Sequence, residues 1–319
     1  MAPTILVAGA TGNTGRSVVE TLSRLLQTSE KSLPGNHQIL ALTRSLNGAA
    51  AQRLARLPGV QVVEQNWIEI TADWLRQHNV VRAFIAPHNQ PNQFAQESTF
   101  HLAALDAGVE YVVRISTTAA NVRADCPAYY ARSHWAIEAL LGSPAFQRLH
   151  WTSLQPNVFT SFCLAPAVEL VKNYRRTGKL GTPLAIMASE DAPVGIIDAD
   201  DVGVLAAHLL VERDSSAHNR AKYVLNGPQD ITGRQIVRMV EDLIGTKVED
   251  VRFKDMSFVE QLVAAAPPQE SRNVILSIRH AAETAWDGKC KAETTSKEVL
   301  ELAAPRRTPA ETFKMMLEL

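Results

Sequence analysis

A tyrosine, a histidine and a glutamate stand at intervals of four residues near the middle of the chain. Tyr130, His134 and Glu138 therefore share one face of the helix predicted over 128–141. The strand predicted just before that helix, 111–116, ends in Ser116. A phenol, an imidazole and a hydroxyl that meet in a cleft can exchange a proton with a bound substrate. We take Tyr130, His134 and Ser116 as the candidate catalytic residues.

A glycine-rich loop lies between the first predicted strand and the first predicted helix. Backbone N–H groups at a helix N-terminus can approach a phosphate only where side chains are absent, and the helix dipole favours the negative charge. Glycine used for a turn alone is the alternative, which the strand before and the helix after disfavour. The candidate phosphate-binding residues are Gly9, Thr11, Gly12, Asn13, Thr14 and Gly15.

The residues after the second predicted strand bear on which dinucleotide binds. An NAD-selective fold usually places an acidic residue there, whereas this chain has Thr43-Arg44-Ser45 and no carboxylate at that point. An arginine can donate two hydrogen bonds to a 2′-phosphate. The sequence therefore predicts NADP(H) as cofactor and Arg44 as its ligand. The alternative is a solvated Arg44 without a role, and binding of either dinucleotide stays open.

Strands and helices must alternate to position these residues. Predicted strands cover 4–8, 38–43, 60–64, 80–86, 111–116 and 149–155. Predicted helices cover 13–28, 48–57, 72–78, 97–107 and 128–141, and 29–37 is a polar loop. This alternation requires a parallel sheet with right-handed crossovers. We expect an α/β fold: a Rossmann-type doubly wound parallel sheet with a smaller, mostly helical C-terminal substrate lobe.

The regular alternation of predicted strands and helices ends after Pro156. Helices are predicted over 159–174, 200–210 and 232–244, a loop over 178–191, and strands over 194–197 and 223–225. We expect residues 1–155 and about 194–226 to form the NAD(P)-binding Rossmann domain. Residues from about 156–193 and 227–319 would form the substrate-binding lobe, with the cleft between the two units.

The glycine spacing GxxGxxG within AGATGNTGR resembles that of extended and atypical short-chain dehydrogenases. Within them the chain looks most like the NmrA-like family, which includes isoflavone-reductase-type enzymes, quinone reductases and a fungal redox-sensing regulator. The resemblance covers most of the chain. The segments TRS, RIST, the YxxxH and HxxxE spacing, LQPNVF and IIDADDVG follow one another in the family's order.

This resemblance implies further cofactor contacts. The loop after the third strand touches the adenine in similar proteins, which here assigns Asn66 and Trp67. The loop after the fourth strand follows the pyrophosphate and ribose, which assigns Pro87, His88 and Asn89. A packing role is an equally good interpretation of Trp67.

The resemblance also implies a nicotinamide contact and a substrate pocket. The proline-containing turn after the sixth strand crosses the nicotinamide face in related enzymes, which assigns Pro156 and Asn157. Phe159 and Phe162 would make the adjacent pocket apolar and would suit a hydrophobic or aromatic substrate. Their alternative is ordinary helix core.

One departure from the family pattern affects catalysis. The resemblance implies a lysine four residues after the tyrosine, and His134 stands there. A histidine with its usual pKa of about 6.5 could hydrogen-bond to the nicotinamide ribose or act as a general acid, but it lacks a permanent charge. The alternative is that Tyr130 and His134 only pack.

Composition narrows the class of protein. The chain has 319 residues, 46% apolar content and a net charge of -1, which favours a folded protein and disfavours direct nucleic-acid binding. We expect no signal peptide, no membrane segment and a cytoplasmic location, with the scattered cysteines reduced. Asp198, Asp200 and Asp201 resemble a metal cluster but head a helix, where carboxylates cap backbone N–H groups, so no metal is expected.

Two functions from different classes fit these residues. The first is an NADPH-dependent oxidoreductase acting on a small apolar carbonyl, enone or quinone. The second is a non-catalytic NADP(H)-binding redox sensor that controls a protein partner. An isomerase or lyase stays open because fold does not fix chemistry. The sequence also leaves open a homodimer.

Overall fold

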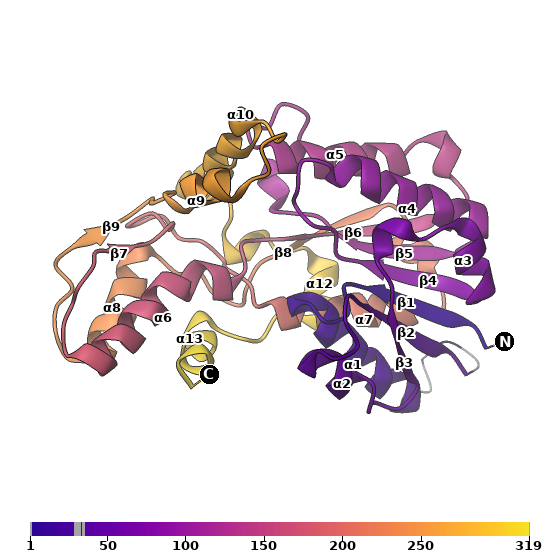
Figure 1. Cartoon of the computed structure of the whole chain (residues 1–319), viewed down its shortest axis with the longest axis horizontal. Helices are drawn as coiled ribbons and strands as arrows, with labels where there is room; N and C mark the ends of the chain where they lie inside the picture. The colour runs from indigo at the N-terminus through magenta and orange to yellow at the C-terminus, as the bar shows by residue number, and fades with distance from the viewer. Residues whose placement is uncertain (1, 29–32, 34–35, 319) are drawn as a thin grey trace.

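The computed structural model describes residues 2–28, 33 and 36–318, so most of the loop predicted over 29–37 lies outside the described residues (Figure 1). A seven-stranded parallel sheet runs through the larger part of the molecule in the order β3-β2-β1-β4-β5-β6-β8. The strands are β1 (Thr4–Ala8), β2 (Gln38–Thr43), β3 (Val60–Glu64), β4 (Val80–Ile85), β5 (Tyr111–Ile115), β6 (His150–Pro156) and β8 (Ala221–Leu225). The order reverses between β1 and β4, and ligands of such sheets bind at the carboxyl ends beside that point.

Alternate residues of the strands enter two separate hydrophobic cores. Ile5 and Val7 of β1 face one core, and Leu6 and Ala8 face the other. Helices α1 (Asn13–Thr28), α2 (Ala49–Leu54), α7 (Ala199–Val211) and α12 (Lys297–Ala303) cover the first face. Helices α3 (Ala72–Gln77), α4 (Gln93–Ala107) and α5 (Tyr129–Leu141) cover the second (Figure 1). Both faces of β1 are therefore buried, which explains its continuous apolar run.

A third core fills a smaller lobe beyond β6 and β8. Helices α6 (Thr160–Thr177), α8 (Gly233–Ile244) and α13 (Pro309–Glu318) pack there with a short sheet of β7 (Leu184–Ala185) and β9 (Val251–Arg252). Thr232 caps α8 in a capping box with Gln235. Helices α9 (Phe258–Ala265), α10 (Arg272–Leu276) and α11 (Glu283–Trp286) complete the lobe.

The C-terminal segment returns from the lobe to the large sheet. Ser296 N donates to Val224 O (3.0 Å), and Val224 N donates to Ser296 Oγ (2.9 Å). Asn226 N donates to Thr295 Oγ1 (3.2 Å). Because β8 is the last strand of the sheet, residues 295–296 cover its outer edge.

The fold class is confirmed, and three local predictions differ. Residues 194–197 form no strand, since Val194 bridges Ile231 and Ile197 bridges Phe159, so no ladder develops. The loop predicted over 178–191 contains β7. Helix α4 begins at Gln93 and not at residue 97, because its polar first turn is held by buried hydrogen bonds that no apolar pattern reveals. The division into domains at 155, 194 and 226 stays a prediction.

The predicted acidic cluster lies at the start of α7. Asp198 caps this helix through a hydrogen bond from Asp200 N (2.9 Å), and Arg307 Nη1 contacts both Asp198 Oδ1 (3.0 Å) and Asp200 Oδ2 (2.7 Å). Asp201 accepts the backbone N–H groups of Arg306 and Arg307. The three carboxylates thus fasten the C-terminal segment to α7. In the described part of the chain, no helix combines the length and hydropathy that a bilayer span requires.

Substitution of Gly15 tests how closely α1 packs on the turn after β1. A Cβ at Gly15 would stand 2.1 Å from Gly9 O and 2.9 Å from Ala10 Cα, and both are backbone atoms. We expect Gly15→Ala to lower the free energy of unfolding in urea by about 3 kcal/mol or more. Gly181→Ala is the control because nothing lies within 4 Å of its Cβ position. Equal stability of the two variants would contradict this packing.

Candidate functional site

The glycine loop occupies the carboxyl end of β1, beside the point where the strand order reverses. Gly9 has a φ of 80°, a left-handed conformation that glycine adopts without strain, and its carbonyl accepts from Gly12 N (2.9 Å). Helix α1 then begins at Asn13. Gly12 and Asn13 are exposed, so the first N–H groups of α1 are not covered by other side chains. This arrangement can accept a phosphate.

A cavity of about 690 Å³ lies between the carboxyl ends of the central strands and the smaller lobe. The sheet side contributes Asn13, Thr14, Pro87, Ser116, Tyr130 and Pro156. The lobe side contributes apolar and aromatic side chains, among them Phe159, Phe162, Met187, Met256, Phe258 and Trp286. Among the described residues that line it, none carries a charged side chain. Burial raises the pKa of its two ionisable groups, Tyr130 and Cys163, to about 12 each.

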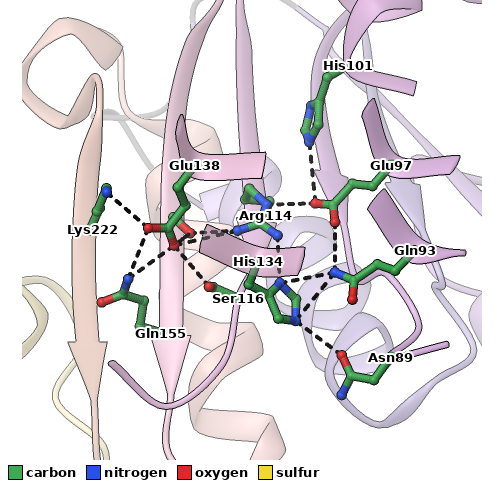
Figure 2. A network of polar contacts seen from close by, with 11 residues as sticks. Asn89, Gln93, Glu97, His101, Arg114, Ser116, His134, Glu138, Gln155 and Lys222 are labelled. Atoms are coloured by element: carbon green, nitrogen blue, oxygen red, sulfur yellow. Dashed lines mark hydrogen bonds and ion pairs between the residues drawn. The ribbon is translucent and has the colours of Figure 1, made fainter. Parts of the chain in front are cut away.

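A buried network of polar contacts lies behind this cavity, centred on Arg114 of β5 (Figure 2). The Arg114 side chain is 0% exposed. It donates to Glu97 Oε1 through Nε (2.7 Å), to Ser153 Oγ through Nη1 (2.9 Å) and to His134 Nδ1 through Nη2 (2.8 Å). Glu97 also accepts from Gln93 Nε2 (3.0 Å). Burial opposes ionisation of Glu97, but the charge of Arg114 and the hydrogen bonds from His101 and Arg114 together outweigh it and hold the pKa of Glu97 well below its usual value.

The ring of His134 has a defined protonation state in this network. Because a guanidinium can only donate, Nδ1 must accept from Arg114, and the ring proton must stand on Nε2. Nε2 then donates to Asn89 Oδ1 (3.1 Å). Burial, and next the charge of Arg114, lower the pKa of His134 to about 3. His134 is therefore neutral at physiological pH, and the general-acid role considered from the sequence does not fit this geometry.

Ser116 connects the cavity to a second buried carboxylate. Its Oγ donates to Glu138 Oε1 (2.9 Å), which also accepts from Ser153 Oγ (2.7 Å). Glu138 Oε2 contacts Lys222 Nζ (3.1 Å), whose side chain is partly exposed. Burial opposes the charge on Glu138, but Arg114, Ser153 and Lys222 together lower its pKa. Since the proton of Ser116 is committed to Glu138, its oxygen presents lone pairs to the cavity.

Tyr130 lines the cavity, and no residue that the structure describes places a cation beside its hydroxyl. Its ring meets that of His134 edge to face, with 6.4 Å between centroids, and the Thr117 side chain forms a hydrogen bond to its hydroxyl. The Thr117 contact lowers the pKa of Tyr130 less than burial raises it, so the phenol stays protonated at neutral pH. It can donate a hydrogen bond, or a proton to a strongly basic oxygen.

A profile of the NmrA-like family matches residues 1–302, almost the whole chain. The chain belongs to the NmrA-like family. No curated protein matches the sequence of this NmrA-like protein.

Solved structures agree with this family on the level of the fold. The NADPH-dependent quinone oxidoreductase QOR2 from Escherichia coli, complexed with NADPH, has a TM-score of 0.70 and 21% identity over 98% of this chain and 99% of that one. Triphenylmethane reductase from Citrobacter sp., complexed with NADP(H), has a TM-score of 0.70 and 22% identity over 98% of this chain and 100% of that one. NmrA, a negative transcriptional regulator, in complex with NAD, has a TM-score of 0.70 and 15% identity over 99% of this chain and 96% of that one.

The cavity of this NmrA-like protein brings together only part of the predicted cofactor residues. The predicted residues that line it are Asn13, Thr14, Pro87, Asn89, Pro156 and Asn157. The Asn157 amide, however, is used within the protein, since Nδ2 contacts Gly195 O, Asn226 Oδ1 and Cys290 O at 3.0–3.1 Å. It joins the lobe to the sheet and has no donor left for a ligand.

Three predicted adenine or ribose contacts, Asn66, Trp67 and His88, lie outside the cavity. Asn66 Oδ1 accepts from Ile68 N (3.4 Å) and caps a single 3-10 turn, Trp67–Glu69. The Trp67 ring lies 5.7 Å from that of His88, centroid to centroid. His88 Nδ1 accepts from Gln90 N (3.2 Å), and its Nε2 donates to Gln96. Their cofactor roles stay predictions.

Arg44 follows β2 directly, is exposed and lies outside the cavity. This position is compatible with its predicted contact to a 2′-phosphate. Glu64 is a neighbour that the sequence analysis missed. It ends β3 opposite Thr43, and its Oε2 accepts from Leu46 N (3.0 Å). A carboxylate therefore does lie at this corner, supplied by the adjacent strand.

Arg114 is the most informative residue that sequence analysis missed. It stands inside the buried strand YVVRI, where a charge requires a buried partner. That signal was present in the sequence. The identity of the partners was not, because Glu97 and His134 come from two different helices.

Substitution of His134 by the family's lysine tests the neutral state of this position. We expect His134→Lys to lower the free energy of unfolding by about 3–5 kcal/mol, because it removes an acceptor of buried Arg114 and adds a second buried cation. Urea unfolding measures this. His280→Lys is the matched control, since His280 is exposed and faces Glu283. A His134→Lys variant as stable as this control would contradict the assignment.

Proposed function

We propose that this chain is an NADP(H)-dependent oxidoreductase that acts on a small apolar carbonyl, enone or quinone. One observation carries the proposal. The start of α1 after the glycine loop, the Tyr130 hydroxyl and the apolar side chains of the lobe all border the same cavity. A dinucleotide phosphate, a proton donor and an apolar acceptor can therefore be held within reach of one another.

The residues at the carboxyl end of β1 fit a dinucleotide. Gly12 is exposed, and a Cβ there would approach Gly9 O to 3.2 Å, so a side chain at this position would crowd the turn that a phosphate group must approach. Exposed Arg44 at the end of β2 favours NADP(H) over NAD(H). The negative charge of Glu64 opposes binding of a 2′-phosphate at this corner. The preference for NADP(H) therefore depends on the guanidinium of Arg44. The named neighbours are solved with NADPH, NADP(H) and NAD.

The lining of the cavity supports an apolar acceptor. An ionised carboxylate would lose its hydration there without gaining a cationic partner, which is strongly unfavourable. An aromatic or conjugated carbonyl compound would instead bury its surface against Phe159, Phe162 and Trp286. Two of the named neighbours are a quinone oxidoreductase and a triphenylmethane reductase, which agrees with a conjugated acceptor.

The bound cofactor would supply the hydride. Tyr130 holds the acceptor oxygen by donating a hydrogen bond, and it supplies the proton as negative charge develops there. Because its pKa lies at about 12, the phenol is present in the donating form throughout the neutral range. The apolar lobe excludes water from the reacting atoms, which strengthens this hydrogen bond.

The second candidate function is redox sensing without turnover. The specific observation in its favour is that, among the described residues, none places a cation beside Tyr130, while His134 is neutral and forms a hydrogen bond with Asn89. A sensor needs only to bind the two redox forms differently. Calorimetric affinities for NADP+ and NADPH that differ by tenfold or more, in a protein that oxidises no acceptor and binds a partner only with one form, would favour it.

Replacement of Tyr130 tests the oxidoreductase proposal. We expect steady-state NADPH oxidation with a panel of quinones and enones to fall about 100-fold or more in Tyr130→Phe, because the proton donor is lost, while NADPH affinity stays unchanged. Tyr174→Phe, outside the cavity, is the control. From pH 6 to 9 the wild-type rate should show no loss from ionisation of the phenol. No turnover, or turnover indifferent to the change, argues against an enzyme.

Replacement of Arg44 tests the choice of dinucleotide. We expect Arg44→Ala to weaken NADPH binding about tenfold or more, because a charge-assisted contact to the 2′-phosphate is lost, and to leave NADH binding within about twofold. Isothermal titration calorimetry at fixed salt measures both affinities. Arg53→Ala removes an exposed charge on nearby α2 and serves as the control. An equal effect on NADPH and NADH would refute a role at the 2′-phosphate.

A further inference from the structure

Asn89 is fixed at two of its atoms in the loop between β4 and α4. Its backbone carbonyl accepts from the Tyr129 hydroxyl, and its Oδ1 accepts from His134 Nε2 (3.1 Å). Both partners belong to α5, the helix that carries Tyr130. Asn89 also lines the cavity together with Tyr130 and Ser116. The loop is thereby joined to the helix of the candidate proton donor.

The orientation of the Asn89 carboxamide follows from the protonation state of His134. Arg114 donates to Nδ1, so Nε2 carries the proton and requires an acceptor. Of the two atoms that Asn89 can present, only Oδ1 accepts. The amide nitrogen must therefore lie on the opposite side of the carboxamide from the imidazole, as Figure 2 shows.

Two donor hydrogens of Asn89 are left for a ligand. No residue in the described part of the chain accepts a hydrogen bond from Nδ2, whereas Oδ1 and the carbonyl oxygen are both used. The side chain is exposed and borders the cavity. Ser116 offers only lone pairs there, whereas Asn89 Nδ2 and the Tyr130 hydroxyl are two donors that border the same cavity.

We propose that Asn89, oriented by His134, donates to the ribose hydroxyls of the nicotinamide half of the dinucleotide, in place of the lysine ammonium that the family pattern places at position 134. This inference rests on the proposed NADP(H) binding. Arg114 gives the physical reason for the exchange, since a lysine at position 134 would bring a second cation against a fully buried guanidinium. A neutral histidine accepts from Arg114 on one side and passes a fixed hydrogen bond to Asn89 on the other.

Titration calorimetry with NADPH and with 2′,5′-ADP, the adenosine half alone, tests this proposal. We expect Asn89→Ala to bind NADPH about tenfold more weakly, the loss of one hydrogen bond, and 2′,5′-ADP as wild type. Asn89→Asp still accepts from His134 but has no donor, so we expect it to lose at least as much NADPH affinity. Asn92→Ala is the matched control, the same exchange in the same loop at a residue outside the cavity.

The outcomes separate this inference from the proposed function. If Asn89→Ala or Asn89→Asp binds NADPH as wild type, or if either loses both ligands equally through collapse of the loop, the role of Asn89 is refuted while NADP(H) binding stands. Wild-type protein that binds no NADPH refutes the proposed function itself. Independently of any cofactor, ¹⁵N NMR of the histidine side chains at pH 7 should show His134 in the neutral Nε2–H form, and an Nδ1–H form or an imidazolium would overturn the proposal.

Discussion

A permanent positive charge lies on β5, an interior strand of the sheet, without contact with water. Arg114 requires an acceptor for each direction of its guanidinium, and it obtains them from α4, from β6 and from α5. The cost of dehydrating the charge makes these partners obligatory. Helices α4 and α5 are therefore fixed to β5 by polar contacts as well as by the apolar core. Asn89 lies in the loop that leads into α4, and Tyr130 lies in the first turn of α5.

Much of the fold can be predicted from the sequence where burial alone determines the pattern. Strands β1, β2 and β3 and helix α1 have the predicted bounds, because apolar runs flanked by glycine or polar residues leave few other choices. The prediction failed where long-range polar contacts decide. The first turn of α4 looks like loop because Gln93 is polar, yet Gln93 is buried against Glu97. Residues 194–197 look like a strand, but each bridging residue there has a different partner.

In the candidate site too, the positions of residues could be predicted from the sequence, whereas the outcome of long-range polar contacts could not. Residues at the carboxyl ends of parallel strands must converge, so Asn13, Ser116 and Pro156 were predictable as neighbours in one cavity. The protonation state of His134 was not predictable, since it depends on Arg114, twenty positions earlier in the chain. The sequence also does not show that the Asn157 amide donates its hydrogen bonds to Gly195 and Cys290, which join the sheet to the smaller lobe.

Residues 295–296, which hydrogen-bond to the outer edge of β8, affect how the protein can associate with other chains. An edge strand with free N–H and C=O groups is a template for pairing with another chain, and β8 would be such a strand if it stood alone. Here a segment that returns from the smaller lobe shields it, through hydrogen bonds between Ser296 and Val224. The C-terminal segment thus protects the large sheet against edge-to-edge pairing with another chain, and removal of this segment would expose the N–H and C=O groups of β8.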